Sequence, residues 1–368
     1  MLLAATLWLP NMHRLHTRDQ ASRKELAGAL VARQLAPQSE DVPRMRERNP
    51  EWDFMRRTYT VLALANLALG TGGAERARLL AGIDGIVDAT LRDDARLGAE
   101  HFLLAYARRE PFRDRETRSL FVDGELVMMI AARELVELRA ELLQDARVRA
   151  ARIERTMRRG PALSGESYPN ECWTFCNTTA LAALAMLDRV DGTDHGALAR
   201  AWVAHARKHL VDPATGILVS SYTYDGHVLD GAEGSSIWMS AHNLLVIDDA
   251  FARDQYARAH RELAGGLFGY AWAREWPKGA AMRPDVDSGP IVPFLDASAG
   301  SSGLALLGAS AFADEEYLGG LLASLELAGF REGDHYLASN AVGDAVLLYA
   351  LTNGPLWRRV RGAHGDRS

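Results

Sequence analysis

Cysteine is scarce in this chain, making up only 2 of its 368 residues. A disulfide-stabilised scaffold is therefore excluded, and a reducing, cytoplasmic setting is the default expectation. Positive charge is also in deficit, because 42 Lys and Arg face 48 Asp and Glu, a formal net charge of −6. Since phosphate binding favours a basic surface, a nucleic-acid partner is not expected.

Long apolar runs are missing as well. No stretch of about 18 apolar residues occurs, so the sequence predicts no membrane-spanning helix. Residues 1–10 are apolar, but this segment is short and lacks the basic start of a signal peptide. We interpret residues 1–20 as a first packing segment or N-terminal extension. The alternative is the remnant of a longer membrane or signal segment.

Apolar residues at helical spacing dominate the rest of the chain. Hydrophobic residues make up 48% of it and charged residues 24%, as in a soluble globular protein with a large core. Steps of three and four between apolar residues, with short Gly, Pro and Asp breaks, predict about a dozen helices. These are 23–35, 54–69, 74–91, 94–107, 123–143, 178–187, 195–210, 235–247, 251–267, 300–312, 315–327 and 341–351.

Successive helical hairpins without clear sequence repeats predict an all-α fold, an (α/α)6 barrel with an inner and an outer ring. No Pro/Ser-rich linker divides the chain, so we expect residues 1–368 to form one domain. Residues 217–229 contain Asp225-Gly226 and predict a short β-hairpin. Long loops are expected on one face, where sites usually lie: 108–120, 159–174, 211–236, 273–299 and 328–340. A solenoid of helix pairs is the alternative fold.

Both cysteines, Cys172 and Cys176, lie four residues apart in the segment 165–179. On a helix, this spacing would place both sulfurs on one face. A metal pair is disfavoured because no partner pair of ligands is present, and we predict no metal site. Two interpretations remain open. The thiols are small buried apolar groups, or they are reactive or proton-relaying groups whose pKa is lowered by a helix N-terminus.

Glu125 sits among strongly apolar neighbours in the segment 121–129. Apolar surroundings disfavour the charged carboxylate and raise its pKa, which would make Glu125 a general acid near neutral pH. The alternative is a glutamate near a helix start that faces water or caps backbone donors.

Asp285 and Asp287 lie two residues apart in a stretch with Pro and Gly on both sides. In an extended backbone they would face the same side and could share a proton, orient a hydroxyl or bind a cation. The alternative is an Asx-turn that ties the loop to itself.

Aromatic residues and histidines near these segments are candidate substrate-binding residues. A wall of aromatic rings suits an apolar or carbocation-like ligand, because ring faces attract positive charge. Ordinary core packing is the alternative for each. The candidates are Tyr168, Trp173, Tyr224, His227, Trp238 and His242.

The segment from Tyr168-Pro169-Asn170 through Cys176-Asn177, with Asp188-Arg189 and Asp248-Asp249 after it, resembles the bacterial linalool dehydratase/isomerase family. The resemblance spans roughly residues 115–350 and is densest over 165–255. It implies an (α/α)6 barrel with a hydrophobic cavity and cofactor-independent acid–base chemistry on an alkenol. It also implies site residues of the Cys, His, Tyr and Asp types and allows a homo-oligomer.

Carry-over of the family's site residues is partial. Cys176 matches a cysteine that precedes Asn, whereas the family's other cysteine in this segment aligns with Ser167, near Cys172. Glu125 stands where the family has His. The family's N-terminal site segment, which contains tyrosine and cysteine, has no clear counterpart in 36–52.

Three functions are therefore weighed. The first is a cofactor-independent lyase, isomerase or cyclase that acts on a small apolar alkenol, terpenoid or polyene. In it Glu125 is the acid, Asp285 or Asp287 is a second acid–base group, and the cysteines line the cavity. The second is an (α/α)6 carbohydrate-active enzyme with paired carboxylates. The third is a non-catalytic helical-repeat binding protein.

Overall fold

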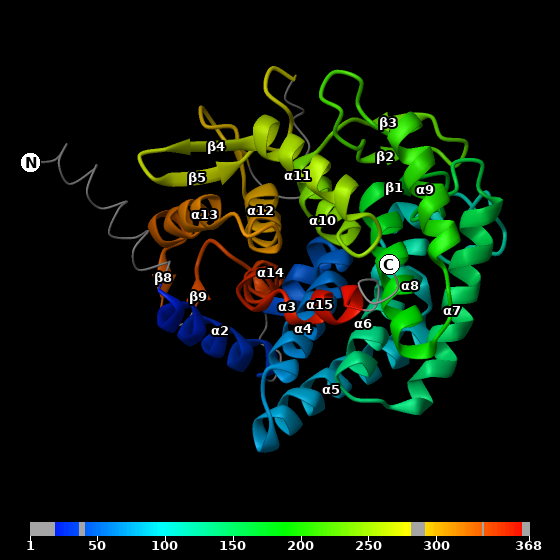
Figure 1. Cartoon of the computed structure of the whole chain (residues 1–368), viewed down its shortest axis with the longest axis horizontal. Coiled ribbons are helices and arrows are strands. Elements are labelled where there is room, and N and C mark those ends of the chain that lie inside the picture. Colours follow the sequence, from blue (N-terminus) through cyan, green and yellow to red (C-terminus); the bar gives the residue numbers. More distant parts are fainter. Residues whose placement is uncertain (1–18, 37–40, 281–290, 333–334, 363–368) are drawn as a thin grey trace, which may run out of the picture.

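The computed structural model describes residues 19–36, 41–280, 291–332 and 335–362. Within these residues, six helices form an inner ring in which each helix packs on the next and the last packs on the first. In ring order they are α4 (Pro50–Leu69), α6 (Leu120–Val136), α8 (Thr174–Asp191), α10 (Gly234–Leu244), α12 (Ala299–Ala311) and α14 (Ala341–Thr352). The prediction of an all-α (α/α)6 barrel is confirmed (Figure 1).

A second layer of helices surrounds this ring. It contains α2 (Gln20–Leu35), α5 (Gly73–Leu97), α7 (Ala140–Arg159), α9 (Gly196–His209), α11 (Asp249–Leu263) and α13 (Glu315–Ala328). Of these, α2 packs on α14, α5 on α4, α7 on α6, α11 on α10 and α13 on α12. Short α3 (Asp41–Arg48) packs on α4, and α15 (Pro355–Arg361) packs on α4, α6 and α8.

The inner helices differ from the outer ones in sequence as the two layers require. Every residue of α6 is buried, whereas α7 is polar on one side and buries only one face. A helix that is apolar all round has to be enclosed, and an amphipathic one covers it. Local residues define the start of α4. The Asn49 side chain accepts a hydrogen bond from the Glu51 N–H, and Pro50 occupies the first turn.

The two ends of the barrel are different. The inner helices begin at one end, which we call the mouth, and the long connections 98–119, 160–173, 210–233, 264–298 and 329–340 lead into them there. At the opposite end, α15 lies across the ring. Its Leu356 N–H donates to Asn66 Oδ1 at 2.8 Å, and Trp357 Nε1 donates to the His242 carbonyl at 3.1 Å.

Short strands lie in the connections at the mouth. The predicted hairpin is confirmed as β2 (Ser221–Tyr222) and β3 (Val228–Asp230), and β1 (Cys172–Trp173) adds a third strand to it. Three two-stranded hairpins follow: β4 (Ala264–Leu267) with β5 (Tyr270–Ala273), β6 (Ile291–Val292) with β7 (Ala297–Ser298), and β8 (Arg331–Glu332) with β9 (His335–Tyr336).

Several predicted helix bounds are wrong. The expected helix 94–107 does not form, because α5 runs on to Leu97 and Gly98 then turns the chain with φ 78°. Two 3₁₀ turns, η1 (Ala99–Phe102) and η2 (Ala105–Arg108), follow it. The expected helix 123–143 is divided by extended backbone at Glu137. None of the described helices is both long and apolar enough to cross a bilayer.

Gly124 allows α6 and α8 to approach closely. A Cβ at this position would lie 3.2 Å from Ala180 Cα, which is tighter than ordinary van der Waals contact. We expect Gly124→Val to lower the free energy of unfolding by about 2–3 kcal/mol, because the added methyl groups have to separate the two helices. Urea denaturation measures this. Gly85→Val is the control, since a Cβ there has nothing within 4 Å, and an equal loss in both variants would contradict the explanation.

Candidate active site

Consecutive inner helices bring three glutamates toward the mouth. Glu51 lies in the first turn of α4, Glu125 in the second turn of α6, and Glu171 just before β1 and α8. Glu51 and Glu171 are half-buried, whereas Glu125 is only 2% exposed. The site therefore has two carboxyl groups at its entrance and one inside the ring.

Glu125 is the deepest of the three. Its burial raises the pKa of the carboxyl group to about 8, and the Thr58 hydroxyl beside it offsets part of that rise. Its Oε2 has no hydrogen-bond partner among the described residues. Glu125 thus neither faces water nor caps a helix, and a carboxyl group with this pKa holds its proton at neutral pH.

Tyr59 and Cys176 lie close enough to Glu125 for its carboxylate charge to raise the pKa of both. Burial raises the pKa of the Tyr59 hydroxyl well above its usual range, and the charges of Glu125 and Cys176 raise it further. The Tyr59 hydroxyl has no hydrogen-bond partner within the described part of the chain. Glu125 therefore sits among polar groups from α4 and α8 that are themselves uncharged at neutral pH.

Above Glu125, aromatic side chains hold the other two glutamates. The Tyr168 hydroxyl donates to Glu51, and the Tyr106 ring stacks on the Tyr168 ring with centroids 4.5 Å apart. The Tyr106 hydroxyl donates to Glu171 Oε2 at 3.0 Å, and Trp173 Nε1 donates to the same oxygen at 3.2 Å. Burial and the neighbouring Glu51 raise the pKa of Tyr168, so this hydroxyl remains a donor. We call these five residues the mouth cluster.

The two cysteines lie beside this cluster with protonated thiols. Cys172 is in β1 opposite Tyr222, and Cys176 is in the first turn of α8. Burial raises the pKa of both thiols, and nearby carboxylates raise it further, Glu51 and Glu125 in the case of Cys176. The predicted lowering of the pKa by the helix N-terminus is wrong, because burial outweighs it. No third metal-ligating side chain is grouped with them among the described residues.

Tyr224 and His227 lie on the hairpin that borders the mouth. Tyr224 is half-buried, and its backbone N–H donates to Asn170 Oδ1 at 3.4 Å. His227 is exposed at the turn, where its N–H donates to Thr223 Oγ1 at 3.0 Å. The structure thus brings Tyr224 near the segment that carries the mouth cluster and leaves His227 on the outside.

Trp238 and His242 lie away from the mouth cluster. Trp238 packs between the inner and outer layers of helices, against Tyr256 of α11. Its Nε1 donates to Ser301 Oγ at 3.1 Å. His242 lies near the end of the barrel opposite the mouth. Its Nε2 is 2.7 Å from the Tyr349 hydroxyl, and burial lowers its pKa to about 3. The spacing of four predicted a shared helix face, but it could not predict that both side chains fill the core.

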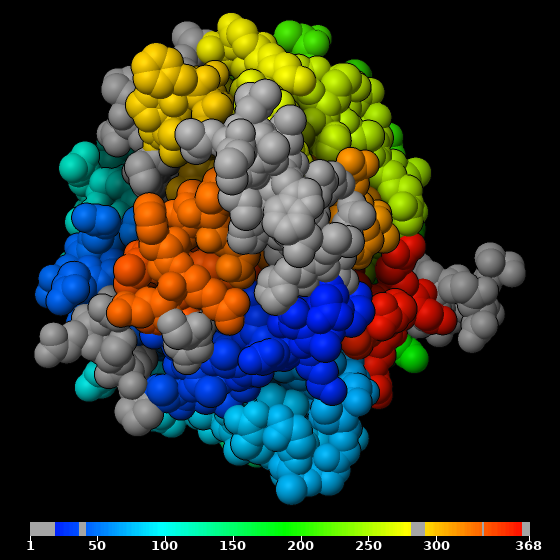
Figure 2. Space-filling view, turned by 90° about the vertical axis from the view of Figure 1, so that its left-hand side faces the viewer, coloured from blue at the N-terminus to red at the C-terminus, as the bar shows by residue number. Residues whose placement is uncertain are grey.

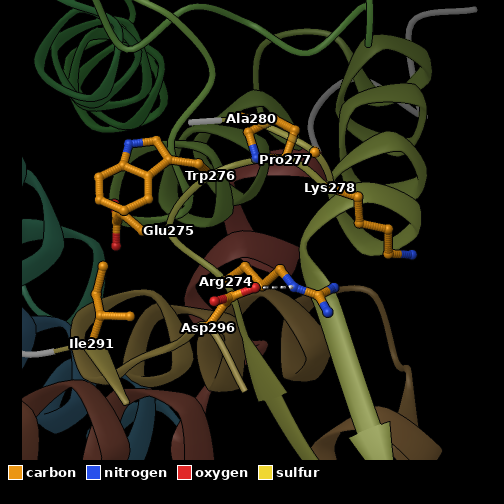
Figure 3. Close-up of a pocket in the computed structure, with 9 residues that line it drawn as sticks. Arg274, Glu275, Trp276, Pro277, Lys278, Ala280, Ile291 and Asp296 are labelled. Carbon is orange, nitrogen blue, oxygen red and sulfur yellow. Dashed lines mark ion pairs between the residues drawn. The ribbon is translucent and has the colours of Figure 1, made fainter. Parts of the chain in front are cut away.

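Asp285 and Asp287 fall outside the described residues. The described part of their loop lines a pocket of about 130 Å³. The lining residues are Arg274, Glu275, Trp276, Pro277, Lys278, Gly279, Ala280, Ile291 and Asp296. Figure 3 shows the Trp276 ring and the Arg274–Asp296 ion pair, 3.9 Å long, at separate parts of its wall. Glu275 accepts from the Ser235 N–H at 3.0 Å and from Ser298 Oγ at 2.6 Å. It therefore ties the starts of α10 and α12 together.

Sequence reasoning missed Glu51, Glu171 and Tyr106. One signal was available for Glu51, because Asn49-Pro50 is a recognisable helix start that places the next residue at a helix mouth. Nothing local marks Tyr106 or Glu171, since their contact joins segments 65 residues apart.

Comparison with known proteins shows that this chain shares its fold with a solved structure. No family model matches the chain. A solved structure of a GH76 alpha-mannanase from Bacteroides thetaiotaomicron is similar to it, with a TM-score of 0.54 and 12% sequence identity. The match covers 96% of this chain and 99% of the mannanase chain. At this identity, what the two chains share is the fold.

The resemblance to linalool dehydratase/isomerase is wrong, and so is the lyase, isomerase or cyclase function on an apolar substrate that came with it. The structural neighbour is a glycoside hydrolase. Three of the residues that carried the resemblance have folding roles. Asn177 holds Gly165 through two hydrogen bonds, Asp188 binds the His195 N–H, and the Asp248 side chain caps α11. At these three positions the resemblance rests on residues that stabilise local structure.

Proposed function

We propose that this chain is a carbohydrate-active enzyme that hydrolyses a glycosidic bond at the mouth cluster. The observation that carries the proposal is the pairing of Glu125, a buried carboxyl group with a pKa of about 8, with Glu51 at the entrance above it. Glycoside hydrolysis needs one protonated and one ionised carboxyl group. The fold shared with the GH76 alpha-mannanase supports the same class.

Each carboxyl group has a role in this proposal. Glu125 donates its proton to the glycosidic oxygen as the bond to the sugar breaks. Glu51 accepts a proton from water as the water attacks the sugar from the other side. Thr58 lies beside Glu125 and is seven residues after Glu51 in α4. The rise of the helix between Glu51 and Thr58 is about 10 Å. This favours the wider separation of inverting enzymes, which leaves room for that water.

The rest of the mouth cluster suits sugar binding. Glu171 can accept hydrogen bonds from sugar hydroxyls, and the half-buried rings of Trp173 and Tyr106 offer apolar faces beside it. Aromatic rings with polar tips are well matched to a ligand that has both C–H and O–H surface. Because Glu125 is 2% exposed, we expect the stacked Tyr106 and Tyr168 to part when a glycan enters.

The proposal predicts that the purified chain releases new reducing ends from a glycan. The mannanase makes alpha-mannan the first polysaccharide to test, followed by other α- and β-linked glycans. Chromatography of the products identifies the bond that is cleaved, and proton NMR of the first product gives its anomeric form. We expect inversion. Absence of both turnover and glycan binding across the panel would contradict the proposal, whereas binding without turnover would favour a binding protein.

A further inference from the structure

Three exposed phenylalanines share an unusual backbone conformation. Phe268, Phe294 and Phe330 have φ angles of 53°, 69° and 53°, in the left-handed region. Their exposed fractions are 54%, 102% and 69%. Left-handed backbone is costly for a bulky side chain. At Phe268 the two-residue turn between β4 and β5 requires this conformation, but glycine or asparagine suits such a position better than phenylalanine. A phenylalanine side chain that stays in water does not compensate for that difference.

These residues lie on neighbouring parts of one side of the barrel. Phe268 is in the turn of β4 and β5, and Trp272 of β5 donates from Nε1 to the Leu295 carbonyl at 2.9 Å in the turn of β6 and β7. Helix α13 packs along β5, and Phe330 follows α13. In Figure 1, β4, β5, α13 and β8 are on the left, and Figure 2 turns this side toward the reader.

More apolar side chains accompany the phenylalanines. Leu267 and Leu295 adjoin two of them, and the Leu337 N–H donates to the Phe330 carbonyl at 3.2 Å. All three leucines are exposed. We call the six residues the apolar face: Leu267, Phe268, Phe294, Leu295, Phe330 and Leu337. A whole aromatic side chain has about 150–250 Å² of surface, so the exposed fractions of the three phenylalanines leave roughly 300–600 Å² in water. With the leucines, the apolar face reaches the upper end of the range for the largest patch of a typical monomer, about 300–600 Å².

We propose that two copies of this chain associate through the apolar face. Its area, on the order of 600–700 Å², approaches the roughly 800 Å² that each partner contributes to a standard stable interface. Burying Phe294 and Phe330 against apolar atoms would offset the cost of their left-handed backbone. The contact would be isologous, so that the same face serves both copies.

The charges beside the apolar face favour a second copy over other partners. Arg331 pairs with Glu326 at 3.4 Å, Arg274 pairs with Asp296 at 3.9 Å, and Glu332 adds a further acid. Both signs are therefore present without an excess of positive charge. A self-complementary interface needs such a balance, whereas binding to an anionic membrane surface needs a cluster of basic residues. The chain's net charge of −6 likewise disfavours an anionic membrane surface.

Sedimentation equilibrium over about 1–100 µM tests this proposal. We expect a dimer for the wild type and at least about 30-fold weaker association for Phe294→Ser and for Phe330→Ser, as for hot-spot residues. Leu138→Ser is the matched control, because Leu138 is 63% exposed on the connection between α6 and α7. A monomeric wild type, or equal weakening by all three substitutions, would overturn the proposal.

A glycine variant separates an interface role from a folding role. Phe294→Gly relieves the backbone at φ 69°, since glycine adopts this region without strain. We expect it to weaken the dimer while leaving the stability of the monomer unchanged or higher. Loss of monomer stability with an unchanged dimer would overturn the proposal. A second outcome would also overturn it: a monomeric wild type that sediments with phosphatidylcholine vesicles, and a Phe294→Ser variant that does not. The apolar face would then bind a lipid surface.

Discussion

The substitution Glu125→Gln is expected to lower kcat/KM for glycan hydrolysis by about 10²–10⁴-fold, the contribution of a positioned general acid. The new amide side chain would fill the same space on α6, but its N–H groups are far too weakly acidic to protonate the departing oxygen. Wild-type activity should also fall as the pH rises past about 8, because Glu125 loses its proton there. Initial rates on the glycan found in the screen, measured across the pH range, report both effects.

Controls separate the chemistry of Glu125 from its place in the core. Glu134→Gln changes another buried glutamate of the same helix, whose Oε2 accepts from the Arg139 N–H near the far end of α6. This variant should keep its activity. An aryl glycoside with a nitrophenolate leaving group needs little help from an acid, so Glu125→Gln should retain far more activity on it than on the natural bond. Equal loss on both substrates would show that Glu125 is not the acid.

The fold could be predicted from the sequence because the barrel is built from local patterns. Apolar residues at helical spacing define α12, α13 and α14 to within one residue at each end. The bounds failed where a single backbone position decides them, as at Gly98 with φ 78° and at Glu137 with extended backbone. Closure of the ring, α14 against α4, joins segments almost 300 residues apart and has no local signature.

The candidate site was less accessible to sequence reasoning. Glu125 could be singled out because a carboxyl group among apolar residues needs an explanation, and the structure places it inside the ring. Glu51 stands between Pro50 and Trp52 with charged residues near it, a pattern that is equally typical of a solvated helix start. The hydrogen bond from the hydroxyl of Tyr168, 117 residues away, places it at the mouth. Trp238 lies among candidate site residues in the sequence, but the structure buries it between the inner and outer helices, against Tyr256.

The same buried carboxyl group should make the stability of the protein depend on pH. The pKa of Glu125 rises from 4.5 in the unfolded chain to about 8 in the folded one. Between these values the native state holds a proton that the unfolded state has released, so stability falls as the pH rises through this window and levels off above it. A shift of this size corresponds to a loss of about 5 kcal/mol.

Glu125→Gln cannot ionise and should escape that loss. Compared with the wild type, we expect it to be of similar stability at about pH 5 and more stable by several kcal/mol at about pH 9. Urea denaturation at both pH values measures the difference, and Glu137→Gln, on a side chain that is 58% exposed, should follow the wild type instead. If Glu125→Gln and the wild type lost stability in parallel, the carboxyl group would already be ionised at neutral pH. Glu125 could then not serve as the acid, so this measurement tests the proposed chemistry without knowledge of the substrate.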